Sequence, residues 1–69
     1  MRLEVRTYAH SADDKVRFFY DIVDLDDVIL FQGKELPELV AYSQKGWSKE
    51  ETARSNGLKH IEEILNDKG

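Results

Sequence analysis

Residues 48–66 read Ser-Lys-Glu-Glu-Thr-Ala-Arg-Ser-Asn-Gly-Leu-Lys-His-Ile-Glu-Glu-Ile-Leu-Asn, and this stretch decides the fold class. Its apolar and small residues recur at helical spacing as one stripe, namely Ala53, Gly57, Leu58, Ile61, Ile64 and Leu65. Charged residues occupy the other faces, which is typical of an amphipathic helix laid on a sheet. Ser48 and Glu51 have the spacing of a capping box, so we expect a helix over residues 49–66.

Gly57 lies inside this helix and on its apolar stripe. A glycine there costs about 1 kcal/mol relative to alanine. In one interpretation the missing side chain lets a continuous helix approach the sheet closely. In the other, Asn56-Gly57 ends one helix and a second begins. We expect the continuous helix.

The first half of the chain alternates with a period of two. Apolar or small residues alternate with polar ones over residues 2–9 and again over residues 15–23, which predicts two half-buried strands. The aspartate-rich residues 24–27 are expected to form a turn. The apolar run within residues 27–32 predicts a third strand that is ended by Gly33; it is either a central strand covered on both sides or an edge strand packed into a dimer. The short links favour an antiparallel meander.

A second, shorter helix is expected between the strands and the long helix. Pro37 suits the first position of a helix, and Gly46 suits the position just after its end. We expect this helix over residues 37–44, with an irregular segment over residues 36–45 as the alternative.

Residues 1–69 are therefore expected to form a single α+β domain: a three-stranded antiparallel β-meander followed by a short helix and a longer amphipathic helix packed on the sheet. The expected core consists of Leu3, Val5, Val16, Phe18, Ile22, Leu30, Ala53, Leu58, Ile61 and Leu65. A chain of 69 residues without cysteine has a small core and no disulfides. Packing or self-association must supply its stability.

Composition argues against several functions. The net charge is −4 and the basic residues are scattered, whereas nucleic-acid binders concentrate theirs on one face. The longest apolar run, residues 28–31, is far shorter than the roughly 18 residues that span a bilayer. The N-terminus lacks the apolar segment of a signal peptide. We expect a cytoplasmic protein that binds neither nucleic acid nor membrane.

No catalytic, cofactor-binding or metal-binding residues are expected. Nothing in the sequence brings His10 and His60 together, and no nucleophile motif accompanies either one. The aspartates differ in spacing from a calcium-binding loop, so we interpret them as a solvated turn; they are Asp21, Asp24, Asp26 and Asp27. The chain is therefore expected not to be an enzyme.

The aromatic content is the best functional lead in the sequence. The predicted second strand carries large apolar side chains on both faces, with Phe18 on one and Phe19 on the other. One helix covers only one face, so the second face needs the short helix or a partner. The candidate interface consists of Tyr8, Phe19, Val23, Ile29, Phe31 and Trp47. We expect a non-enzymatic interaction module that forms a homodimer or binds another protein.

The alternative is a DNA-binding or antitoxin-like regulator that uses residues 46–65 as a helix-turn-helix-like element. Ala53 and Gly57 have the offset of four that such motifs share. The recognition helix would then be residues 59–67, whose acidic side chains would face phosphates.

The order of short motifs also resembles a known family. An aromatic-rich strand (residues 18–23), a polar turn, the pair Val28-Ile29, the segment 46–49 and the segment 56–61 follow one another as in the YegP-like family of small βββα domains. An insertion around residues 37–45 separates them. The resemblance implies a sheet-plus-helix module that pairs as a dimer or occurs in tandem, without an established reaction. Antitoxin-like βββα domains show a weaker similarity at the helix start.

Overall fold

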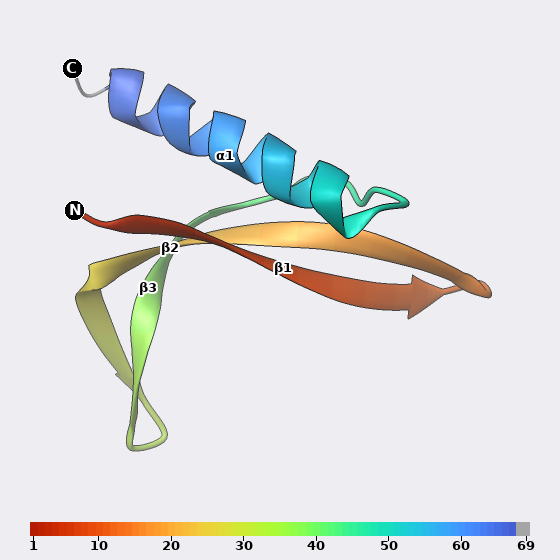
Figure 1. Cartoon of the computed structure of the whole chain (residues 1–69). Coiled ribbons are helices and arrows are strands. Elements are labelled where there is room, and N and C mark those ends of the chain that lie inside the picture. Colours follow the sequence, from red (N-terminus) through yellow and green to blue (C-terminus); the bar gives the residue numbers. More distant parts are fainter. Residues whose placement is uncertain (68–69) are drawn as a thin grey trace.

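The computed structural model describes residues 1–67 of the chain. Three strands form an antiparallel sheet in the order β1-β2-β3, and one helix follows them. The elements are β1 (Leu3–Ala12), β2 (Lys15–Phe31), β3 (Lys34–Tyr42) and α1 (Glu50–Asp67). Figure 1 shows the helix lying across one face of the sheet, while the far end of the β2–β3 hairpin bends away on the opposite side. The predicted α+β class and antiparallel meander are confirmed.

The β1–β2 hairpin follows the predicted alternation. Val5 pairs with Ile22 and Thr7 pairs with Tyr20, so these side chains share one face of the sheet. Asp13 and Asp14 close the hairpin with positive φ angles of 50° and 61°. Aspartate tolerates this left-handed conformation better than most residues, which explains why Asp13 and Asp14 form the turn of this hairpin.

The expected turn at residues 24–27 and the separate strand at 27–32 are wrong, because β2 runs without interruption from Lys15 to Phe31. The aspartates form a bulge instead: Asp24 pairs with Glu38 and Val28 pairs with the adjacent Pro37, so residues 25–27 have no partner in β3. A bulge bends the strand that carries it. This bulge therefore redirects the second half of β2.

The expected short helix at residues 37–44 is also wrong, and so is its irregular alternative, because these residues belong to β3. A two-residue turn of Gln32 (φ 52°) and Gly33 (φ 80°) reverses the chain, and Phe31 pairs directly with Lys34. Both φ angles suit the tight hairpin turn that matches strand twist. Cross-strand pairing with β2 thus overrides the helical spacing of this segment.

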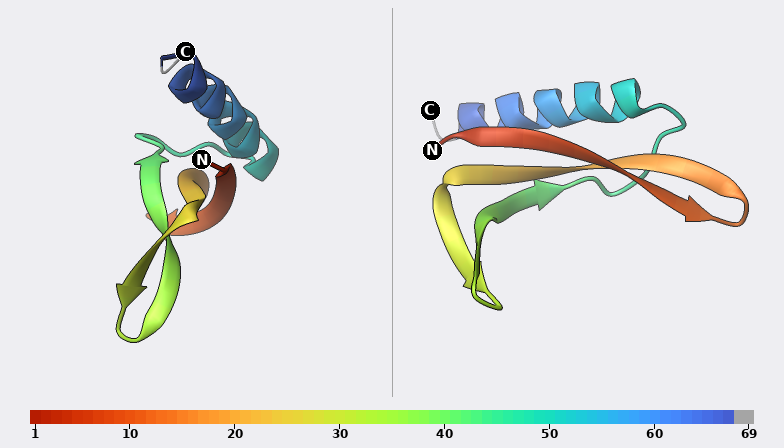
Figure 2. Two further views of the ribbon diagram at one scale, coloured as in Figure 1. Left: turned by 90° about the vertical axis from the view of Figure 1, so that its left-hand side faces the viewer. Right: turned by 60° about the horizontal axis from the view of Figure 1, so that its bottom comes forward.

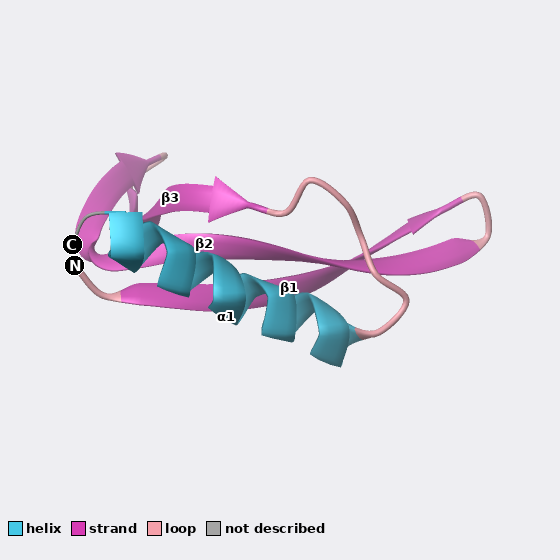
Figure 3. Cartoon of the chain, turned by 90° about the horizontal axis from the view of Figure 1, so that it is seen from above, coloured by secondary structure: helices cyan, strands magenta, loops and turns pink. Residues whose placement is uncertain are grey.

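Helix α1 covers the face of β1 and β2 that carries Val5, Tyr20 and Ile22 (Figure 3). It is continuous through Gly57, as expected, and the close approach is present: a Cβ at Gly57 would lie 2.7 Å from Val5 Cγ1. Its first turn is tied to β1, since the Thr7 hydroxyl donates a hydrogen bond of 3.1 Å to Glu50.

The core is smaller than expected. Its buried apolar residues are Val5, Tyr20, Ile22, Val23 and Ala53, with Leu3, Ala41, Trp47, Ile61 and Ile64 partly buried against the central cluster. The core assignment is correct for Val5, Ile22 and Ala53, and Leu3, Phe18 and Ile61 are half-buried. It is wrong for four residues that are about half or more exposed, namely Val16, Leu30, Leu58 and Leu65.

Candidate functional site

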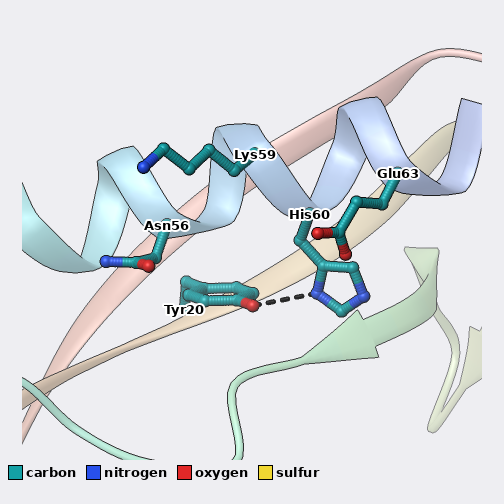
Figure 4. Close-up of a pocket in the computed structure, with 5 residues that line it drawn as sticks. All are labelled: Tyr20, Asn56, Lys59, His60 and Glu63. Atoms are coloured by element: carbon teal, nitrogen blue, oxygen red, sulfur yellow. Dashed lines mark hydrogen bonds between the residues drawn. The ribbon is translucent and has the colours of Figure 1, made fainter.

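A shallow depression of about 300 Å³ lies between α1 and the middle of β2. It is lined by one strand residue and four helix residues: Tyr20, Asn56, Lys59, His60 and Glu63. Figure 4 shows the Tyr20 ring under the helix with its hydroxyl directed at the His60 ring. The helix supplies these side chains because residues three and four apart share one face.

Tyr20 is the centre of this arrangement. Its hydroxyl lies 2.8 Å from His60 Nδ1, and its ring stacks on Trp47 with centroids 5.7 Å apart. Burial, and then the negative charge of Glu63, raise the pKa of Tyr20 above its ordinary value of 10.0. The hydroxyl is therefore protonated at neutral pH and donates to His60 when Nδ1 carries no proton. The pair fastens α1 to the sheet.

The structure keeps the two histidines apart. His10 lies on the face of the sheet opposite α1. Its ring and the Phe19 ring form a T-shaped pair with centroids 6.4 Å apart. His60 lies on α1. The sequence indicated no contact between His60 and Tyr20, because a tyrosine on a strand and a histidine on a distant helix carry no common spacing.

Two aspartates of the bulge, Asp24 and Asp26, form hydrogen bonds or ion pairs with other groups of the chain. Asp24 is buried and accepts hydrogen bonds from the backbone N–H groups of Arg2 (3.2 Å) and Asp26 (2.9 Å). Asp26 pairs with the N-terminal ammonium (3.1 Å) and Arg2 (2.8 Å). The hydrogen bond from Arg2, followed by that from the N-terminus, lowers the pKa of Asp26 below its usual range. Across residues 1–67, no three His, Asp or Glu side chains gather as a metal site would require.

The candidate interface residues fall into separate places. Tyr8 and Phe19 stack with centroids 5.7 Å apart on the face opposite α1. Val23 has the same orientation but is buried. Trp47 packs on the helix side against Tyr20, with Lys45 Nζ 5.7 Å from its ring centroid.

Ile29 and Phe31, the remaining two, lie in a projecting hairpin. We call residues 28–37 the arm, which consists of the end of β2 and the start of β3 beyond the bulge. Its large apolar side chains are exposed, by 54% for Val28, 49% for Ile29, 76% for Leu30, 58% for Phe31 and 41% for Leu36. Figure 2 shows the arm extending away from the helix in both views. Within residues 1–67, helix α1 contacts β1 and β2 but not β3.

The molecule is unusually open for its mass. Its accessible surface is 5379 Å², whereas a folded chain of 8.0 kDa exposes about 4,500 Å². The radius of gyration is 13.3 Å, compared with about 11 Å for a compact chain of this length. The excess surface is close to the roughly 800 Å² that each partner buries in a standard protein interface.

The arm was missed in the sequence although a signal for it exists. Gln32-Gly33 separates the apolar run 28–31 from Leu36, and a two-residue polar and glycine link between apolar runs is typical of a hairpin. Pro37 obscured this pattern because proline at that point also suits a helix start. In β3 it lies on an edge strand, where proline is tolerated.

Comparisons with protein families, with curated proteins and with solved structures give no match for this chain. The described part of the chain holds no helix with the length and apolar character needed to cross a bilayer.

Proposed function

We propose that this chain is a non-enzymatic interaction module that acts as a homodimer. The observation that carries the proposal is the arm, where five large apolar side chains are between 41% and 76% exposed on a hairpin that the helix does not reach. An isolated two-stranded hairpin is at best marginally stable in water. Apolar surface of this kind marks a contact with a partner.

A second copy of the chain is the partner that fits best. The excess accessible surface of about 900 Å² matches one side of a standard interface. A chain with so few buried apolar residues also gains stability by self-association.

The helix–sheet depression supports the non-enzymatic part of the proposal. Its lining contains no serine or cysteine nucleophile, and Tyr20 and His60 are hydrogen-bonded to each other. A catalytic site of the usual kind holds its reacting groups in a cleft that excludes water. This depression is shallow and open to solvent.

Two matched variants test the proposal by light scattering coupled to size-exclusion chromatography. Leu30→Glu places a charge on the arm, and Leu58→Glu places one on the outer surface of α1, where the side chain is 54% exposed. We expect Leu58→Glu to keep the dimer mass and Leu30→Glu to elute as a folded monomer with unchanged circular dichroism. If Leu30→Glu keeps a dimer mass, the arm is not the interface; a monomeric wild type would show that the proposed homodimer is wrong.

A further inference from the structure

One edge of the arm is open for strand pairing. The pairing of β1 with β2 ends at Leu3 and Asp24, and the last bond on that side runs from Leu25 N–H to the Arg2 carbonyl at 2.9 Å. Beyond it, the arm segment of β2 pairs with β3 on one side and with nothing else in residues 1–67. An unpaired strand edge is a template for another strand.

The hairpin turn determines which backbone groups lie on this edge. Phe31 and Lys34 close a two-residue turn, so they exchange both of their backbone hydrogen bonds. Bonded and non-bonded pairs alternate along an antiparallel ladder. Val28 and Leu30 therefore direct their N–H and C=O groups away from β3. Pro37, the partner of Val28, agrees with this alternation, because its missing N–H removes no bond from the ladder.

The two edges of the arm differ in chemistry. The β3 edge carries Pro37 together with Lys34, Glu35 and Glu38, and proline and charge are the devices that prevent strand addition. The β2 edge consists of Val28-Ile29-Leu30-Phe31 and carries neither. Strand addition is thus blocked on one edge and permitted on the other.

We infer that residues 28–31 pair antiparallel with the same residues of a second copy, which joins the two arms into one four-stranded sheet. This inference rests on the proposed homodimer and places its twofold axis at the β2 edge. Val28 of each copy exchanges hydrogen bonds with Leu30 of the other, which uses every outward-facing backbone group of the segment. Ile29 then lies on the twofold axis, directly opposite Ile29 of the second copy.

Charge favours the antiparallel arrangement. Asp27 precedes the paired segment and Lys34 follows its turn. Antiparallel pairing brings Asp27 of one copy toward Lys34 of the other. Parallel pairing would place Asp27 of both copies side by side, and like charges directly opposite each other destabilise a strand pair.

A single cysteine tests this arrangement without interference, because the chain has none. In Ile29→Cys the two Cα atoms should be about 4.5 Å apart, as in a non-hydrogen-bonded pair, which is within disulfide range. Leu36→Cys is the matched control, since Leu36 is the direct partner of Ile29 on β3. In the dimer of Leu36→Cys, the Cα atoms of the two cysteines would be separated by three strand spacings, or about 14 Å. We expect mild oxidation at micromolar concentration to cross-link Ile29→Cys almost completely and Leu36→Cys hardly at all.

Amide hydrogen exchange on the wild type provides a second measurement that needs no substitution. The amide protons of Val28 and Leu30 should exchange at least tenfold more slowly when the concentration rises into the dimer range. Equal cross-linking of the two variants, or fast exchange at Val28 and Leu30 in a chain of dimer mass, overturns the edge pairing and leaves the homodimer standing. A monomeric wild type overturns both.

Discussion

The Tyr20 hydroxyl lies 2.8 Å from His60 Nδ1 and joins the centre of β2 to the third turn of α1. Removing the hydroxyl in Tyr20→Phe leaves the stacking on Trp47 possible but breaks this bond. We expect the free energy of unfolding in urea to fall by about 0.5–1.5 kcal/mol. Tyr8→Phe is the control on the opposite face, where the side chain is 46% exposed, and should change it by less than about 0.5 kcal/mol. Equal effects would show that the bond does not stabilise the fold.

The raised pKa of Tyr20 makes stability depend on alkaline pH. The unfolded chain releases the phenol proton near the ordinary pKa of 10.0, whereas the folded chain holds it to higher pH. The folded state then binds more protons than the unfolded state, so stability falls as pH rises above that value. The stability advantage of the wild type over Tyr20→Phe should shrink as the pH rises through and above 10.0. A difference in the free energy of unfolding that stays constant as the pH rises would contradict a raised pKa of Tyr20 in the folded chain.

Gly57 allows α1 to lie directly on the sheet. A Cβ there would meet Val5 Cγ1 at 2.7 Å and Tyr20 Cγ at 3.2 Å. Gly57→Ala should therefore destabilise the fold by about 1–3 kcal/mol, although alanine favours a helix by about 1 kcal/mol. Ser55→Ala, at an exposed position of the same helix, should stabilise it slightly. Thermal unfolding of both variants decides the question; a stabilised Gly57→Ala would mean that the helix lies farther from β1.

Burial predicts which of the apolar residues carry the core. Ile22 is fully buried, and Ile22→Ala should cost about 2–5 kcal/mol in urea unfolding. Leu65 is 48% exposed, and Leu65→Ala should cost less than about 1 kcal/mol. Similar losses for the two variants would show that the end of α1 packs more tightly than this arrangement allows.

The first hairpin and the long helix could be predicted from the sequence because their patterns are local. Alternation over β1 and the start of β2, and the apolar stripe of α1, each specify an element without reference to the rest of the chain. The arm could not be predicted in this way. Its β3 segment has apolar residues at helical spacing, and only pairing with Val28–Phe31 makes it a strand. At the bulge, Asp24 accepts a hydrogen bond from the backbone N–H of Arg2, which is a contact between residues distant in the sequence.

The prediction that some of these apolar residues are buried was wrong for a related reason. Leu30 and Val16 lie in strands with apolar character, but α1 covers only the central part of the sheet (Figure 3). A period of two indicates which face a side chain is on and not how far a covering helix extends. The same limit applies to the candidate interface, where the sequence correctly separated Phe19 from Phe18 by face but did not place Ile29 and Phe31 on an arm.

Sedimentation equilibrium of the wild-type chain tests the central claim most directly. The claim is that the apolar arm is an interface between two copies of this chain. At micromolar concentration we expect a mass of twice 8.0 kDa that falls toward the monomer value on dilution. A mass of 8.0 kDa at every concentration would contradict the claim.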